Sequence, residues 1–113
     1  MKKADQMRII STRFNVSPQA GWDWLKRVEM NDEIYTRRVN AALQATRTDF
    51  TQPEGGMREY LLAFHNVTLF EVASYFGYSE STLSAVVATG RFIDKRPQRA
   101  WTMIDYYLKE NAW

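Results

Sequence analysis

The chain has 113 residues, no cysteine, one histidine and a formal net charge of +2, and 45% of its side chains are hydrophobic. This length fits one domain or two very small ones, and the apolar content is enough to form a buried core. Without cysteine, neither a disulfide framework nor a cysteine zinc site can form. No apolar run has the length of a signal-peptide core or a membrane span. We therefore expect a cytoplasmic protein that uses no metal or cofactor and does not bind membranes.

The charge is unevenly distributed along the chain. Residues 1–48 carry nine basic and five acidic side chains, a net charge of +4, whereas residues 49–113 carry six and eight, a net charge of −2. Clustered basic side chains are the usual footprint of nucleic-acid binding, but pairs of charges are also common on ordinary solvated surfaces. Both interpretations remain open for the local basic patches, which are Lys2 with Lys3, Lys26 with Arg27, Arg37 with Arg38, and Arg91 through Arg99.

Two helices are predicted at the start of the chain. The first covers residues 4–14 and ends at Asn15, a residue type that tolerates the left-handed conformation. Ser17 is a good N-cap, and Pro18 suits the first position of a second helix that continues to about Met30. The apolar residues of the first helix recur at helical spacing: Met7, Ile10 and Phe14.

A third helix and a connecting segment follow. The acidic start at residues 31–33 opens a helix that runs to about Thr46. The segment 49–56 contains a proline and a Gly-Gly pair, so it is the predicted linker. It would divide the chain into an N-terminal helical subdomain, 1–48, and a C-terminal subdomain, 57–113, which begins with a helix over residues 57–66.

The clearest pattern in the chain lies at residues 67–90. Thr68 can cap a helix in a T-x-x-E capping box with Glu71, and Gly77 can end that helix at positive φ. Ser79 can then cap a second helix. Packing of the second helix against the first would leave a polar face outward, made of Ser79, Glu80, Ser81, Ser84, Ala85 and Ala88.

The end of the chain is predicted to form a basic loop and a last helix. The loop begins after Gly90, and Pro97 opens the helix. Such a loop is well placed to hold phosphate without reading base sequence. Taken together, these elements predict an all-α fold, a small bundle of about six to seven helices with one clear helix-turn-helix and a second candidate.

The stretch VTLFEVASYFGYSESTLSAVVATG resembles the DNA-binding headpiece of lactose-repressor-type bacterial regulators and, more loosely, phage repressors. The resemblance implies duplex DNA binding, with the second helix in a major groove. The base-contacting residues would be Glu80, Ser81, Ser84 and Ala85. The phosphate-contacting residues would be Thr68, Ser79 and Thr82, joined by Arg91, Lys95, Arg96 and Arg99 of the basic loop and last helix.

A weaker resemblance covers residues 7–27. The run RFNVSPQAGWDWLKR is similar to helix-turn-helix modules of transposases and excisionases, with Asn15 in place of the turn glycine. The resemblance implies an outward face with contacts from Gln19, Trp22, Lys26 and Arg27. Gly21 does not fit, because an apolar residue is expected there and glycine costs about 1 kcal/mol of helix stability relative to alanine. The alternative is that Trp22, Trp24 and Leu25 are core or interface residues.

No enzymatic motif is present, such as a glycine-rich phosphate loop, a nucleophile elbow or H-E-x-x-H, so we do not expect an enzyme. We expect a sequence-specific duplex DNA-binding protein, a small phage- or plasmid-type transcriptional regulator that forms a homodimer. The alternative is a helix-turn-helix fold used to inhibit or modulate a host protein. That alternative is supported by the carboxylate of Glu80, the short side chain of Ala85 and the many aromatic residues.

Overall fold

The computed structural model describes residues 1–79, 81 and 96–111. These residues form six helices and no strand, which confirms the predicted small all-α bundle. Most of the predicted second helix at 79–90, and the basic loop after it, lie outside the described residues. The helices are α1 (Lys3–Phe14), α2 (Pro18–Glu29), α3 (Glu33–Gln44), α4 (Met57–His65), α5 (Leu69–Tyr75) and α7 (Arg96–Glu110).

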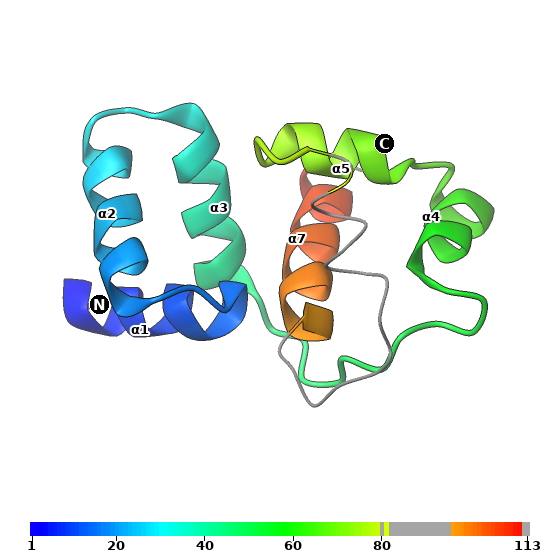
Figure 1. Cartoon of the computed structure of the whole chain (residues 1–113), viewed down its shortest axis with the longest axis horizontal. Coiled ribbons are helices and arrows are strands. Elements are labelled where there is room, and N and C mark those ends of the chain that lie inside the picture. The colour runs from blue at the N-terminus through cyan, green and yellow to red at the C-terminus, as the bar shows by residue number, and fades with distance from the viewer. Residues whose placement is uncertain (80, 82–95, 112–113) are drawn as a thin grey trace.

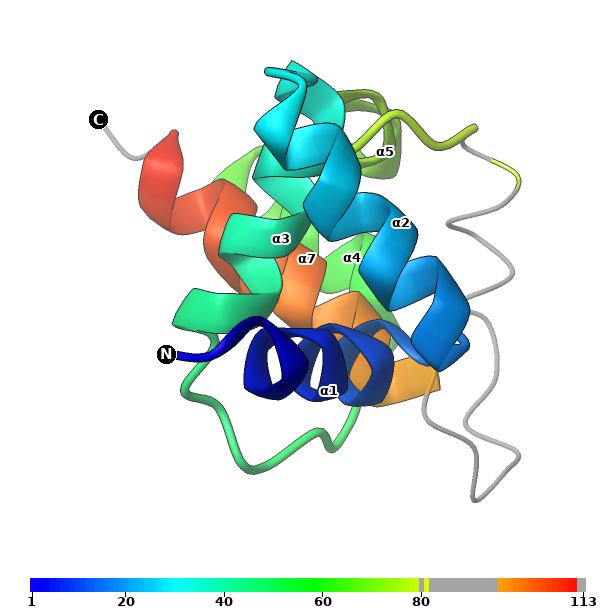
Figure 2. The same ribbon diagram turned by 90° about the vertical axis from the view of Figure 1, so that its left-hand side faces the viewer.

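The first three helices pack together as one unit. In Figure 1, α2 and α3 lie side by side, and α1 lies across their ends. The turned view in Figure 2 shows the same crossing of α1 beneath α2 and α3. Helix α7 packs against α1, α3 and α5, while α4 lies at the far edge of the molecule from α2. Helix α7 therefore connects the N-terminal unit to α5.

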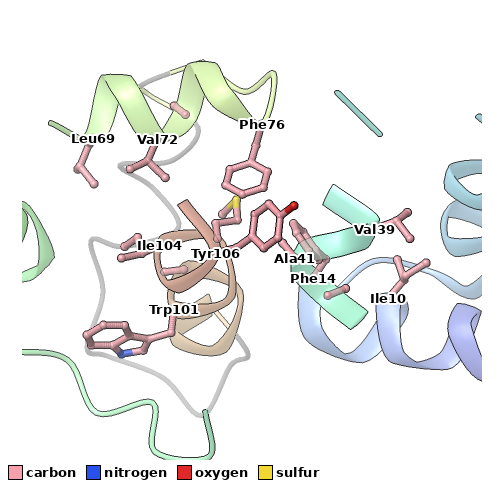
Figure 3. Packing of buried hydrophobic residues seen from close by; sticks show 14 of the residues in the cluster. Ile10, Phe14, Val39, Ala41, Leu69, Val72, Phe76, Trp101, Ile104 and Tyr106 are labelled. Carbon is pink, nitrogen blue, oxygen red and sulfur yellow. The ribbon is translucent and has the colours of Figure 1, made fainter. Parts of the chain in front are cut away.

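A single cluster of buried apolar side chains joins both ends of the chain. Figure 3 shows Phe14 and Ala41 beside the α7 side chain Tyr106, and Phe76, the residue after α5, above the same side chain. The ring centroids of Phe76 and Tyr106 are 6.2 Å apart. Residues from both sides of the 49–56 segment thus share this core. The boundary between the two subdomains stays a prediction.

The segment 45–56 is attached to α7 by side-chain contacts. The guanidinium of Arg47 donates two hydrogen bonds to the Asp105 carboxylate, at 2.7 and 3.1 Å, and lies 3.7 Å from the centroid of the Trp101 ring. The Trp101 indole N–H donates to the carbonyl of Thr51 at 3.2 Å. The Asp105 carboxylate raises the pKa of Arg47. These contacts fix the path of the chain between α3 and α4.

Left-handed residues end four of the helices. Asn15, Asn31, Asn66 and Gly77 all have positive φ, between 52° and 72°. Three of them, Asn15, Asn66 and Gly77, are at helix ends predicted from sequence. Asn31 belongs to the predicted start of the third helix, but it lies in the turn after α2. Asp32 is the N-cap of α3, its carboxylate accepts from the Tyr35 N–H, and the helix begins at Glu33. Helix α3 stops at Gln44, two residues before the predicted end.

Candidate nucleic-acid interface

The first helix of the main predicted motif begins as the sequence indicates. The Thr68 hydroxyl oxygen accepts a hydrogen bond from the Glu71 N–H at 3.2 Å, which is the cap half of the predicted capping box. The Glu71 carboxylate instead accepts from the Tyr107 hydroxyl at 3.4 Å. Val72 and Ala73 are completely buried. The helix start is thus fixed locally, while the Glu71 side chain is directed toward α7.

The turn after α5 has the hydrogen bonds of a Schellman motif. The Tyr78 N–H donates to the Ala73 carbonyl at 2.9 Å, and the Gly77 N–H donates to the Ser74 carbonyl at 3.1 Å. Gly77 has a φ of 72°, and a Cβ at this position would lie only 2.6 Å from the Ile34 methyl Cγ2. Glycine is therefore required twice here, for the backbone conformation and for close approach to α3.

Two arginines of α3 bind the carbonyls at the end of α5. Arg37 donates to the Tyr75 carbonyl at 3.0 Å, and the Arg38 Nε donates to the Phe76 carbonyl at 2.8 Å. Cations at a helix C-terminus are favourable because they offset the negative end of the helix dipole and satisfy orphan carbonyls. The Arg37–Arg38 pair, which sequence alone left as a basic patch or a solvated face, therefore holds the turn in place.

The Arg38 guanidinium also lies among aromatic rings. Its Cζ is 4.0 Å from the Tyr78 ring centroid, 4.8 Å from that of Tyr35 and 5.2 Å from that of Trp24. Arg38 itself is buried. Arg99 of α7 lies 5.0 Å from the centroid of the same Tyr78 ring. Cation–π contacts strengthen when they are desolvated, so Arg38 and Tyr78 fix the turn against α2, α3 and α7.

Sequence reasoning missed this role of Arg38. A signal was present, because Arg38 lies three residues after Tyr35 and four before Ala42, on the apolar stripe of α3. A cationic side chain on an apolar stripe is buried on folding, so it must be stabilised by carbonyls, carboxylates or the faces of aromatic rings.

The predicted contact residues of the main motif that the structure describes lie at or near the surface. Thr68, Ser79 and Ser81 are exposed, and the Ser79 and Ser81 hydroxyl oxygens are 3.2 Å apart. Arg99 is partly buried against Tyr78, and Arg96 begins α7. The Arg96 side chain lies outside the described part of the chain, as do all of Glu80, Thr82, Ser84, Ala85, Arg91 and Lys95.

Helices α1 and α2 form the second predicted motif, with a turn stabilised by nearby residues. Asn15 ends α1 at a φ of 53°, and the Ser11 hydroxyl donates to the Val16 carbonyl at 2.6 Å. The Ser17 hydroxyl oxygen accepts from the Ala20 N–H at 3.1 Å and caps α2, as predicted.

Gly21 lies where α2 approaches α1. A Cβ at Gly21 would lie 3.1 Å from both the carbonyl oxygen and Cγ of Met7. The close approach of the two helices explains why position 21 is a glycine and not the apolar residue expected from the resemblance to other helix-turn-helix modules.

The outward face of α2 is mainly polar. Gln19, Asp23 and Lys26 are exposed, and Trp22 is 44% exposed. Arg27 is exposed too; its Nε donates to the Asp23 carboxylate at 2.9 Å, and its guanidinium lies 4.8 Å from the Tyr35 ring centroid.

The inner face of α2 packs into the core. Trp24 and Leu25 are buried in the core, where the Trp24 ring packs edge-on against Phe14 with a centroid distance of 5.1 Å. Of the three residues offered as core or interface residues, only Trp22 lies outside the core. Helix α2 thus buries one face and presents the other to solvent.

Comparison with protein-family models, curated proteins and solved structures finds no match. Within the described ranges, no helix has the length and apolar character needed to cross a membrane. Those same residues contain no group of three or more His, Cys, Asp or Glu side chains arranged to hold a metal ion. Any function must therefore be argued from the helices and surfaces themselves.

Proposed function

We propose that this chain binds duplex DNA through two helix-turn-helix units. The first unit is α1 with α2, and the second is α5 with the segment that begins at Ser79. The observation that carries the proposal is the outward face of α2, which presents Gln19, Trp22 and Lys26 on a helix whose other face is fixed by α1 and α3. The Asp23 carboxylate on this face is paired with Arg27. A preorganised polar helix on a three-helix support is the usual geometry for reading a major groove.

The dimensions and side chains of α2 suit this task. Twelve residues give a helix about 18 Å long, and the major groove is about 12 Å wide, so α2 can lie in the groove. In this proposal Gln19 contacts a base edge, because a glutamine amide can bond adenine in two places. Lys26 contacts phosphate, and Trp22 makes apolar contact with a thymine methyl or with sugar.

The second unit contributes a fixed turn at the start of its predicted reading helix. The Schellman turn at Gly77 and the contacts of Arg38 with Tyr78 support a rigid entry into the residues after Ser79. Arg99 lies 5.0 Å from the Tyr78 ring of that turn, and Thr68 caps the opposite end of α5. Both are proposed phosphate contacts. The predicted base contacts at Glu80, Ser81, Ser84 and Ala85 belong to the same proposal.

In a cell, this chain would act as a small cytoplasmic regulator of phage or plasmid type, binding DNA as a homodimer. One short helix contacts few base pairs, so two half-sites about 34 Å apart would raise both affinity and specificity. Sequence specificity comes from the base contacts, while the basic side chains supply most of the affinity.

Selection from a pool of random duplexes tests the proposal. The full chain should enrich a consensus sequence. Gln19→Ala and Ser81→Ala should each alter the base preference at defined positions of that consensus. Arg91→Ala and Arg96→Ala should instead weaken binding similarly for all DNA sequences. Glu54→Gln in the segment between α3 and α4 is the matched surface control and should leave the consensus unchanged. Absence of any enrichment would contradict DNA reading and favour the alternative, a fold that modulates a host protein.

A further inference from the structure

The far edge of the molecule, at α4 and α5, carries large exposed apolar side chains. Phe64 is 76% exposed, Phe70 is 59% exposed and Leu62 is 46% exposed. In Figure 1, α4 lies at the opposite side of the molecule from α2. Of these three residues only Phe64 lines a hollow in the surface. The α2 face, which carries the proposed DNA contacts, does not include these residues.

Phe64 is exposed but packs on the ring of a partly buried neighbour, Tyr60. Its ring centroid is 5.5 Å from that of Tyr60, and the Tyr60 ring packs edge-on against the buried Trp101 at 5.7 Å. The Tyr60 hydroxyl and the His65 Nε2 are 3.2 Å apart. An aromatic side chain that is already ordered loses little conformational entropy on binding, which is the property of a binding hot spot.

Phe64 lies between two open hollows and lines both. The larger has a volume of about 710 Å³ and the smaller about 400 Å³. The larger is lined by Phe64, His65, Asn66, Val67, Glu71, Tyr107, Leu108 and Asn111. The smaller is lined by Pro53, Glu54, Glu59, Tyr60, Ala63 and Phe64. Phe64 is the residue common to both linings, and we term the two hollows together with the Phe64 ring the Phe64 groove.

The charges of the Phe64 groove have one sign. Among the residues that the structure describes, its lining includes the carboxylates of Glu54, Glu59 and Glu71 and no lysine or arginine. Arg58 is on α4 but lines neither hollow. The Tyr107 hydroxyl donates to Glu71, and burial, followed by the effect of Glu71, raises the pKa of Tyr107, so this donor stays protonated. The groove is therefore apolar at its centre and acidic at its margins.

These charges discriminate among occupants. DNA and anionic membranes would be repelled by the carboxylates. A second copy of the chain, docked by the same face about a two-fold axis, would bring Glu59 and Glu71 of each copy close to like charges. An apolar helix with flanking cations is complementary to both the Phe64 ring and the carboxylates, and helix-in-groove binding is a common mode for surfaces of this kind.

We propose that the Phe64 groove binds a basic amphipathic α-helix of a partner protein. Apolar side chains of that helix pack on Phe64 and enter the larger hollow beside Val67 and Leu108. Lysine or arginine side chains on its flanks pair with Glu59 and Glu71. This site is separate from the proposed DNA contacts on α2 and does not depend on them, whereas Thr68, a proposed phosphate contact, lies next to it at the start of α5.

Fluorescence anisotropy with two labelled synthetic peptides tests the proposal. Both are helical 18-residue peptides with leucine at i, i+3, i+4 and i+7; one has lysines on its flanks and the other has glutamates at the same positions. The full chain should bind the lysine peptide and not the glutamate peptide. Phe64→Ser should weaken binding at least tenfold, and Glu59→Gln about threefold, with a smaller effect at high salt. Met30→Ser, an exposed apolar residue at the end of α2, is the matched control and should bind like the wild type.

Four results would overturn the proposal. These are no binding of the lysine peptide at concentrations up to about 1 mM, equal binding of the glutamate peptide, equal binding by Phe64→Ser, or sedimentation showing self-association that Phe64→Ser abolishes. The last result would make a second copy the occupant. Because Phe64 is largely exposed, Phe64→Ser should keep the wild-type circular dichroism spectrum and unfolding midpoint, so weakened binding would not reflect unfolding.

Discussion

The two turns proposed to orient the DNA-reading segments are held in different ways. The turn between α1 and α2 is stabilised by neighbours in sequence, namely the Ser11 bond to Val16 and the Ser17 cap. The turn after α5 is held by residues nearly 40 positions away, since Arg38 of α3 binds the Phe76 carbonyl and packs on Tyr78. The first turn should therefore form from local sequence, whereas the second should depend on the folded N-terminal unit.

The largest expected effect comes from breaking the long-range turn. Arg38→Ala removes a buried guanidinium, leaves the Phe76 carbonyl without its donor and opens space among three aromatic rings. We expect a loss of about 3 kcal/mol in the free energy of unfolding, measured by urea denaturation. Arg37→Ala is the control and should cost about 1 kcal/mol, because that side chain is more exposed. Equal effects of the two substitutions would contradict the role given to Arg38.

The turn glycine should be the next most sensitive position. Gly77→Ala places a side chain at a φ of 72° and a Cβ within 2.6 Å of an Ile34 methyl group. The strain and the clash together should reduce the free energy of unfolding by about 2 kcal/mol. Asn15→Gly at the other turn should change it by less than about 0.5 kcal/mol, because glycine adopts the same left-handed conformation. Thermal unfolding of both variants measures these effects. An unchanged unfolding midpoint for Gly77→Ala would show that the position tolerates a methyl group and would contradict the close packing against Ile34.

The helix caps are predicted to have intermediate effects. Ser17→Ala removes the acceptor for the Ala20 N–H, and Thr68→Ala removes the acceptor for the Glu71 N–H. Each should cost about 1 kcal/mol in the free energy of unfolding, whereas Ser17→Asp and Thr68→Asp should retain most of it. Urea denaturation checks this, and a similar loss in the alanine and aspartate variants would indicate that capping is not the cause.

The smallest effect is expected at Gly21. Replacing this glycine by alanine would stabilise the helical conformation by about 1 kcal/mol through helix propensity. The new Cβ, however, would lie 3.1 Å from the Met7 carbonyl oxygen. We expect the two effects to offset each other, with a net destabilisation below about 1 kcal/mol. A stabilisation by the full propensity gain, seen as a raised unfolding midpoint, would show that α1 and α2 are not closely packed there.

The difference between the two turns also explains what the sequence could predict. The helix caps at Ser17 and Thr68 and the left-handed helix ends at Asn15 and Gly77 depend on residues within one helical turn. The local sequence was therefore sufficient to predict them. The exposed side of α2 followed from its periodicity.

The contacts that join the helices depend on positions distant in sequence, and local patterns do not contain them. The contact of Arg38 with Tyr78, the approach of Gly21 to Met7 and the pairing of Glu71 with Tyr107 each became evident only in the fold. The shared core likewise could not be inferred from the proline and glycines of the 49–56 segment.

The most direct test of DNA binding is the salt dependence of affinity for a duplex carrying the selected sequence. Fluorescence anisotropy between about 50 and 200 mM salt should give a steep linear fall of log K with log salt concentration. Lys26→Ala should reduce the magnitude of that slope by about 0.9, the value expected for one lost phosphate contact. A wild-type affinity that does not change with salt, or a slope unaffected by Lys26→Ala, would contradict the proposal that the outward face of α2 lies against DNA.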